Sequence, residues 1–277
     1  MKQLLQQLTL IAPQHPLHQQ VVDIALENGV LQQLGSTGSL ATAGYTIHNF
    51  QDAFISGGWI DLFAFSADPG FEHKETLASM AQAAQAGGFT AVAVLPNTQP
   101  SISNKTTVEY ILQGSKNLPV HIWPMGSISQ KAEGKTLAEM YDMQLAGAVA
   151  FTDGLAPIQN PVLLLKALQY TQAFNGVVVQ MPVLQQFAQM GLINEGIVST
   201  QLGLPGIPAI GEYLAVVQLI ELAKYTGGNL HIAGVSTIEA VNAIYQAKTR
   251  GVNLSCSVSS LHLLFSDEDV KTYDTNL

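Results

Sequence analysis

The segment from residue 58 to residue 70 decides the fold, and it reads Gly58-Trp59-Ile60-Asp61-Leu62-Phe63-Ala64-Phe65-Ser66-Ala67-Asp68-Pro69-Gly70. Its first half is an apolar run opened by two glycines, which predicts a short buried strand. Its second half contains Asp-Pro-Gly, which is typical of a turn that leads into a helix. A strand that ends in such a loop is where an α/β barrel places its chemistry.

From Gly58 onward the sequence repeats a strand, a loop and a helix, as in a parallel sheet with crossover helices. The expected strands are 59–65, 91–95, 120–123, 148–151, 177–181, 230–233 and 253–258, and the expected helices are 75–85, 106–113, 136–145, 161–173, 213–224 and 237–248.

A closed barrel of this class needs eight strands, and residues 266–277 are too polar to supply the missing one. We therefore predict an α/β fold for residues 58–277: a (β/α)8 TIM-like barrel that is incomplete, with about seven strands. The alternative is an open seven-stranded sheet whose edges another subunit covers.

Residues 1–57 read as short strands and turns, which predicts a small N-terminal β-domain. The dipeptide Asn28-Gly29 lies between two alternating apolar runs, the strongest local signal for a β-hairpin in the chain.

Composition limits the possible partners. The net charge is −9, and only 11% of the 277 residues are charged. A nucleic-acid-binding protein needs a basic face, so the net charge argues against this class, and binding to anionic membranes is disfavoured for the same reason. A weakly charged surface is typical of one that a protein partner covers.

The sequence predicts a soluble, cytoplasmic protein. Its single cysteine, Cys256, fits a reducing compartment, and we expect it to be a packed small hydrophobe. No apolar run reaches the roughly 18 residues that indicate a membrane span.

The segment Gly58–Gly70 resembles the first strand of dihydroorotases, members of the amidohydrolase superfamily, which ends Gly-Phe-Ile-Asp-x-His-x-His-x-Arg-Asp-Pro-Gly. The two metal-binding histidines of that motif fall on Phe63 and Phe65, and its substrate-binding arginine falls on Ala67. Side chains two residues apart on a strand point the same way, so both phenylalanines are expected to provide apolar filling. A benzyl group has no lone pair for a metal.

Two later segments keep family residues. Leu95–Pro100 resembles the Met-Pro-Asn-Thr-x-Pro loop, whose asparagine binds the substrate carboxylate, so Asn97 is a vestigial substrate-binding position; it could equally cap its own turn. Ala150–Gly154 resembles Phe-Thr-Asp-Asp-Gly, so Asp153 is a retained metal-ligand position. The alternative for Asp153 is a turn or helix cap.

Two further ligand positions are replaced. The metal-binding histidine of the fifth strand falls on Met181, or on Gln180 if the register shifts by one. The sixth strand resembles His-Ile-x-His-Val-Ser-Thr, and its second histidine is replaced by Gly234. His231 matches the first histidine, which is not a ligand, and we expect it to be a satisfied core residue.

The last residues resemble the family as well. Ser260–Phe265 is similar to Asn-His-Leu-Leu-Phe, for which we expect a structural role of His262. Asn276 aligns with an asparagine that contacts substrate. In dihydroorotases a similar stretch continues into the eighth strand with the catalytic aspartate, so we expect this chain to be a fragment of a longer protein.

The resemblance implies a zinc-dependent hydrolase of cyclic amides in pyrimidine biosynthesis. Because four ligand positions are replaced, we predict an inactive dihydroorotase-like chain, a pseudoenzyme with no catalytic residue, no zinc and a scaffolding or regulatory role. The resemblance implies aspartate transcarbamoylase as a partner, or a homo-oligomer. Two alternatives remain: an active cyclic amidohydrolase that converts carbamoyl aspartate to dihydroorotate at an atypical site around Asn97 and Asp153, and a non-catalytic small-molecule binding module.

Overall fold

The computed structural model describes residues 1–272. The chain divides into two compact units, Met1–Trp59 and Ile60–Leu277, and each is described by itself. Within residues 1–272, no helix combines the length and the apolar character needed to cross a lipid bilayer.

The N-terminal unit is a four-stranded sheet with the order β3-β2-β1-β4. Its strands are β1 (Lys2–Ile11), β2 (Val21–Glu27), β3 (Val30–Ser36) and β4 (Thr46–Ser56). The predicted hairpin joins β2 to β3, where Asn28 and Gly29 have φ values of +52° and +79°. Asparagine and glycine tolerate this left-handed backbone, which a tight hairpin turn requires.

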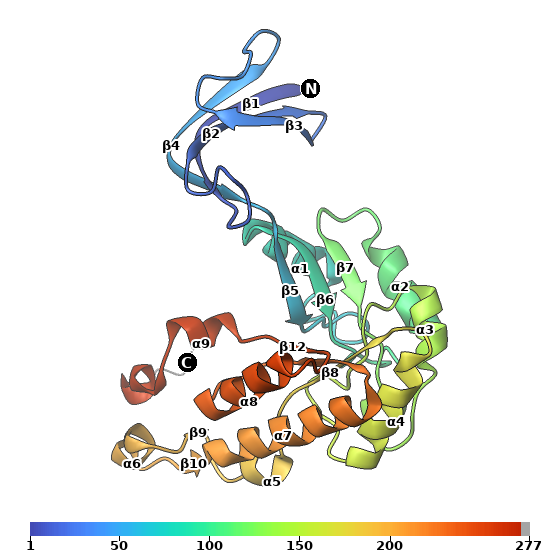
Figure 1. Ribbon diagram of the computed structural model, residues 1–277. Coiled ribbons are helices and arrows are strands. Elements are labelled where there is room, and N and C mark those ends of the chain that lie inside the picture. The colour runs from blue at the N-terminus through green and yellow to red at the C-terminus, as the bar shows by residue number, and fades with distance from the viewer. Residues whose placement is uncertain (273–277) are drawn as a thin grey trace. The chain divides into compact units, whose positions relative to one another are not determined.

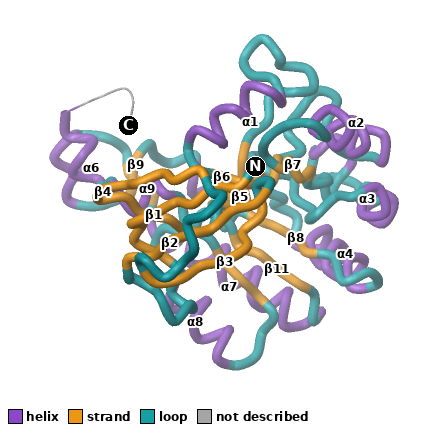
Figure 2. The backbone as a smooth tube through the Cα atoms, turned by 90° about the horizontal axis from the view of Figure 1, so that it is seen from above, coloured by secondary structure: helices purple, strands orange, loops and turns teal. Residues whose placement is uncertain are grey.

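The second unit is an open barrel of parallel strands. Two three-stranded sheets, β5-β6-β7 and β8-β11-β12, form its wall, and Figure 2 shows β8 beside β11. The strands are β5 (Trp59–Ala64), β6 (Phe89–Val94), β7 (His121–Pro124), β8 (Val177–Gln180), β11 (Asn229–Ile232) and β12 (Leu254–Cys256).

A single residue joins the two sheets. Phe151 forms parallel bridges to Gly126, which follows β7, and to Val178 in β8. The wall therefore runs in chain order from β5 to β12 with seven strand positions, which confirms the predicted incomplete barrel.

The predicted fourth strand, Ala148–Phe151, is wrong in extent, because only Phe151 pairs as a bridge. The segment is short because Gly147, with φ +111°, ends the preceding helix, and Gly154, with φ +62°, turns the chain away.

Six helices follow the wall strands, close to the predicted positions, and pack on their outer face (Figure 1). They are α1 (Leu77–Ala86), α2 (Lys105–Ser115), α3 (Met140–Ala146), α4 (Pro161–Gln172), α7 (Ala209–Thr226) and α8 (Ile238–Thr249). Thr76, Asn104 and Asn160 cap the first turns of α1, α2 and α4 through side-chain oxygens, as expected at helix N-termini.

Short elements that the sequence did not predict complete the unit. They are the 3-10 helices η1 (Gln130–Ala132) and η2 (Asp267–Thr272), the helices α5 (Gln185–Ala188), α6 (Ile197–Leu202) and α9 (Ser260–Leu264), and the two-residue strands β9 (Ile193–Asn194) and β10 (Gly206–Ile207).

Strand alternation divides the barrel into two apolar layers. Val92, Val94, Val178 and Ile232 point outward and join the core beneath the helices. The intervening residues form a smaller cluster inside the barrel: Ala93, Leu95, Met125, Ala150, Val179 and Ala233.

Candidate functional site

The carboxyl ends of parallel strands meet at one end of a barrel, so the loops after β5, β6, Phe151, β8 and β11 share its mouth. These loops carry the positions that the sequence comparison with dihydroorotases singled out, and their geometry shows what each one contacts.

The two phenylalanines that replace histidines have different surroundings. Phe63 is half-buried and packs against the apolar cluster inside the barrel. Phe65 lies beyond the end of β5 and is 40% exposed. The expectation that both fill the core is therefore wrong for Phe65. Ala67, at the position of the substrate-binding arginine, is buried.

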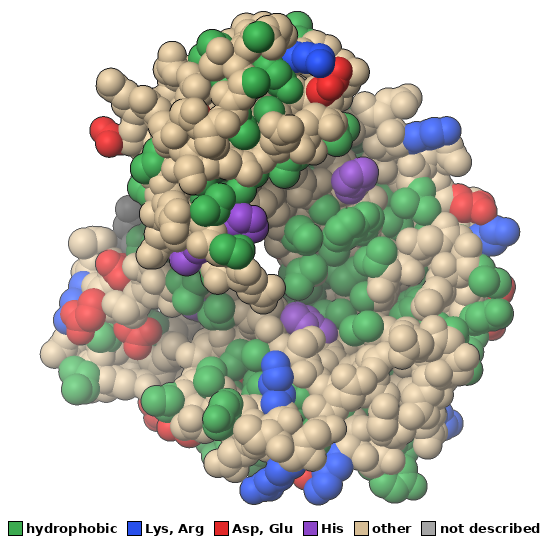
Figure 3. Space-filling view, turned by 45° about the horizontal axis from the view of Figure 1, so that its top comes forward, with side chains coloured by type: hydrophobic (Ala, Val, Ile, Leu, Met, Phe, Trp, Pro, Cys, Tyr) green, Lys and Arg blue, Asp and Glu red, His purple; other side chains and the backbone are tan. Residues whose placement is uncertain are grey.

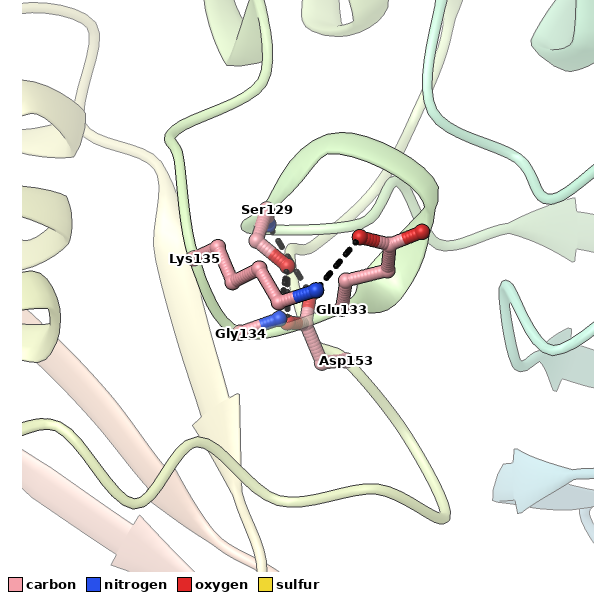
Figure 4. Close-up of polar contacts among 5 residues, drawn as sticks. All are labelled: Ser129, Glu133, Gly134, Lys135 and Asp153. Atoms are coloured by element: carbon pink, nitrogen blue, oxygen red, sulfur yellow. Dashed lines mark hydrogen bonds and ion pairs between the residues drawn. The ribbon is translucent and has the colours of Figure 1, made fainter.

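The carboxylate of Asp153 is completely buried beneath the loop that contains η1. Its Oδ1 accepts a hydrogen bond from the Ser129 backbone N–H at 2.9 Å, and its Oδ2 accepts one from the Ser129 hydroxyl. Ser129 Oγ in turn accepts from the Gly134 N–H at 2.7 Å. Figure 4 shows this network beside the ion pair of Lys135 and Glu133.

Burial raises the pKa of Asp153, and the hydrogen bonds from Ser129 oppose that rise. Both carboxylate oxygens already have protein donors, so the side chain anchors a loop. Its role is broader than the predicted turn or helix cap, because the partner is 24 residues away.

Asn97 is bound to the turn that follows Asp153. Its Nδ2 donates to the Asp153 carbonyl at 3.1 Å, and its Oδ1 accepts from the Leu155 N–H at 3.0 Å. A Cβ added to Gly154 would lie 1.9 Å from Asn97 Oδ1. The amide of Asn97 therefore clamps a neighbouring loop. The two interpretations from the sequence were a vestigial substrate-binding position and a bond to its own turn, and this contact is a third arrangement.

Neither candidate position on the fifth strand places a metal-binding atom at the mouth. Met181 is half-buried, and Gln180 is buried. Gln180 Nε2 donates to the Ile158 carbonyl at 3.0 Å, and its Oε1 has no partner. Because Val179 faces the interior, its neighbour Gln180 faces the opposite side, so a register shift of one does not provide a ligand.

Gly234 has a left-handed backbone with φ +78°, and an added Cβ would meet no atom within 4 Å. Space for a side chain is present here, but the backbone conformation is one that residues other than glycine rarely adopt.

His231 is half-buried, and both ring nitrogens have hydroxyl partners. Nδ1 lies 2.8 Å from Ser255 Oγ, and Nε2 lies 3.0 Å from Ser257 Oγ. Burial lowers the pKa of this imidazole. The ring is satisfied, as expected for a structural histidine.

Two of the C-terminal positions are exposed. Cys256 is exposed, not packed, because β12 is the last strand of the described wall. His262 in α9 is exposed. Asn276 lies outside the described residues.

Two supporting residues were missed at the sequence level. Ser129 has no motif that marks it, because its partner Asp153 is distant in the chain. Glu212 in α7 accepts hydrogen bonds from the backbone and hydroxyl groups of Ser236 and Thr237, ahead of α8. The only sequence signal for this second contact is Thr237, a residue type that often precedes a helix.

The residues at the metal-ligand positions of the family do not fit a zinc ion. A catalytic zinc site normally uses three protein ligands of the nitrogen, sulfur or carboxylate type. Among residues 1–272, no three His, Cys, Asp or Glu side chains come together as such a group. The one carboxylate at a matching position, Asp153, has both oxygens bonded by Ser129.

Comparison with known proteins identifies the family. The model of the dihydro-orotase-like family matches residues 53–240. A dihydroorotase of Syntrophus aciditrophicus is 36% identical over the whole chain, and one of Geobacter sulfurreducens is 38% identical over 93% of it. The chain spans 65% and 60% of the lengths of these two relatives.

Solved structures agree on the fold. An L-hydantoinase (dihydropyrimidinase) from Arthrobacter aurescens matches 98% of this chain with a TM-score of 0.77 at 18% identity, and this chain covers 61% of it. A D-hydantoinase matches 98% of the chain with a TM-score of 0.73 at 14% identity, and 60% of it is covered. The family match covers more than half of the chain, and the barrel has the fold of these hydrolases. The chain therefore belongs to the dihydroorotase-like family of the amidohydrolase superfamily.

Proposed function

We propose that this chain is a catalytically inactive member of its family that acts as a scaffold or regulatory subunit. The observation that carries the proposal is the state of the ligand positions. Phe63, Phe65, Met181 and Gly234 offer no nitrogen or oxygen side-chain donor, and the carboxylate of Asp153 is bonded to Ser129.

The alternative of an active enzyme with an atypical site around Asn97 and Asp153 has less support. The raised pKa of Asp153 is a property that general acids share. However, the carboxylate is completely buried, and a general acid or base must come within hydrogen-bond reach of its substrate. Asn97 is bonded on both its amide oxygen and its amide nitrogen.

Turnover tests the proposal directly. The purified chain, supplied with zinc, is expected not to cyclise carbamoyl aspartate to dihydroorotate, whereas the Geobacter sulfurreducens dihydroorotase serves as the active control. Turnover that a chelator abolishes would contradict the proposal. Turnover that resists the chelator and disappears in Asp153→Asn would favour the atypical site.

For the partner, we propose aspartate transcarbamoylase, with a second copy of this chain as the alternative, in the cytoplasm. The low charged fraction of 11% supports a covered surface, and the single cysteine supports a reducing compartment. Light scattering of the chain alone and mixed with aspartate transcarbamoylase distinguishes these cases. A chain that stays monomeric in both would contradict the scaffold role.

A further inference from the structure

A groove between α7 and α8, on the outside of the barrel, encloses a cavity of about 450 Å³. The two helices pack against each other (Figure 1), and we call the space between them the helix groove. Its volume lies within the range of small-molecule pockets, roughly 300–1,000 Å³. All of its lining residues lie between Tyr213 and Asn253, so both of its walls are helices that the structure describes over their full length.

The floor of the helix groove is apolar. Val217, Ile220 and Ala223 of α7 line it together with Ala243 and Ala247 of α8. Ile220, Ala223 and Ala247 are at most 8% exposed, so the floor is the top of the core beneath the two helices. The side chains that α8 contributes are small and leave room above them. A ligand with an apolar body would bury this surface.

The end of the helix groove nearest the C-termini of both helices is charged, because Glu221, Lys224 and Arg250 line it. Glu221 and Lys224 form an ion pair at 3.5 Å, so their charges largely cancel. Arg250 is the only arginine in the chain. Within residues 1–272, its guanidinium has neither an ion pair nor a hydrogen bond. The groove therefore presents one uncompensated positive charge.

A cation at this place has one ordinary role. Lys224 in the last turn of α7 and Arg250 directly after α8 lie where the helix dipoles favour positive charge. That role requires the charge and uses none of the N–H groups of the guanidinium. These donors form a planar fork that matches the two oxygens of a carboxylate, so they remain available to a ligand.

Such a concentration of charge is unusual on this protein. Only 11% of its residues are charged, and charged side chains are sparse on the face that Figure 3 shows. The net charge of −9 disfavours anions in general. However, exposed charges farther away than roughly 8–10 Å are largely screened at physiological ionic strength. The nearby side chains therefore determine which charge the helix groove accepts.

We propose that the helix groove binds a carboxylate with one negative charge and an aliphatic body, of the medium-chain fatty-acid class. The carboxylate accepts hydrogen bonds from the guanidinium of Arg250, and the aliphatic chain lies along the floor toward Val217. From Lys224 back to Val217, α7 rises by about 10 Å at 1.5 Å per residue, and octanoate has an extended chain of similar length. A dianion such as phosphate is disfavoured by Glu221 and has no apolar part to cover the floor.

Titration of the purified chain with octanoate, followed by saturation-transfer difference NMR below the concentration at which octanoate forms micelles, measures the binding. We expect saturable binding that weakens as salt is added. Octan-1-ol has the same chain without the charge, so we expect it to bind about three- to tenfold more weakly, the loss typical of a charged contact that water partly reaches. Inorganic phosphate should not compete with octanoate.

Two variants in α8 and its cap provide a matched pair. Arg250→Gln should weaken octanoate binding about three- to tenfold and leave octan-1-ol binding unchanged. Lys248→Gln removes the same charge two residues earlier, at an exposed position that does not line the groove, and should change neither affinity. A circular dichroism melt of each variant confirms that it is folded.

Three results would overturn the inference. The first is the absence of saturable octanoate binding to the folded chain, which includes the case in which a polypeptide segment covers the groove. The second is equal binding of octanoate and octan-1-ol. The third is an equal loss of affinity in Arg250→Gln and Lys248→Gln, which would indicate general charge attraction. None of these results bears on metal content or turnover, so failure here is distinguishable from failure of the proposed function.

Discussion

Asp153 is of the residue type that dihydroorotases use at this position, but its carboxylate points into the protein and holds the loop of Ser129 and Gly134. A buried hydrogen-bond donor that loses its acceptor retains its full desolvation penalty. Removal of this carboxylate therefore tests whether its role is structural.

Asp153→Ala should lower the free energy of unfolding by about 2–4 kcal/mol, because it leaves the Ser129 N–H and hydroxyl without an acceptor and creates a cavity. Urea denaturation measures this change. Asp142→Ala, at an exposed position in the first turn of α3, is the control and should cost about 0.5 kcal/mol or less. A stability loss as small as that of the control would contradict the anchoring role.

His231 predicts a dependence of stability on pH. Burial lowers its pKa below the ordinary value of 6.5, so the unfolded chain takes up a proton at a higher pH than the folded protein does. The contribution of His231 is complete above pH 6.5 and is lost as the pH falls through the folded pKa.

The measurement is the free energy of unfolding as a function of pH from neutral pH downward. In His231→Gln the fall in stability below pH 6.5 should be smaller than in the parent chain. An equally steep fall in both proteins would show that burial of His231 does not determine this dependence.

At the scale of elements, the barrel mouth is held by contacts between loops. Asn97, after β6, clamps the turn of Asp153 to Leu155, and Glu212 in α7 holds the residues that begin α8. Each contact joins two segments of the barrel that are distant in the sequence. It therefore contributes to stability and leaves fewer free polar groups at the mouth.

The clamp of Asn97 predicts a coupling with Gly154. Gly154→Ala should cost about 1 kcal/mol for its left-handed backbone and more for the clash of the new Cβ with Asn97 Oδ1. In an Asn97→Ala background the clash is absent, so only the backbone cost should remain. A double-mutant cycle of unfolding free energies should show at least about 1 kcal/mol of coupling; additive costs would contradict the clamp.

Glu212→Ala should lower the free energy of unfolding by about 1–2 kcal/mol, because it removes the acceptor of the backbone N–H and hydroxyl groups of Ser236 and Thr237. Glu221→Ala is a control in the same helix, because Glu221 makes one exposed ion pair, 3.5 Å from Lys224. Such pairs contribute about 0–1 kcal/mol. Thermal melts measure the loss of stability in both variants. Equal losses would contradict a stabilising role of the contact between Glu212 and the residues before α8.

At the scale of the whole molecule, the sequence predicted the barrel because its strands are apolar runs separated by loops and amphipathic helices, a pattern that parallel sheets require. The segment 185–207 escaped prediction because its helices and strands are only two to six residues long and show no clear period. The extent of the fourth strand was also missed, because the glycines on either side limit it.

The candidate site was predictable in its residue types and not in its contacts. Phe63, Met181 and Gly234 can be recognised as non-ligands from their chemistry alone. The bonds of Asp153 and Asn97 join residues 24 and 56 positions apart, and the exposure of Phe65 depends on where β5 ends. These features arise from tertiary packing, which local patterns do not specify.

The central claim is that, within residues 1–272, the barrel brings together no set of side chains able to hold zinc. Equilibrium dialysis of the purified chain against zinc, followed by elemental analysis, tests it most directly. We predict far less than one tightly bound zinc per chain, with no difference between the parent and Asp153→Asn. One or more zinc ions per chain that Asp153→Asn removes would contradict the claim.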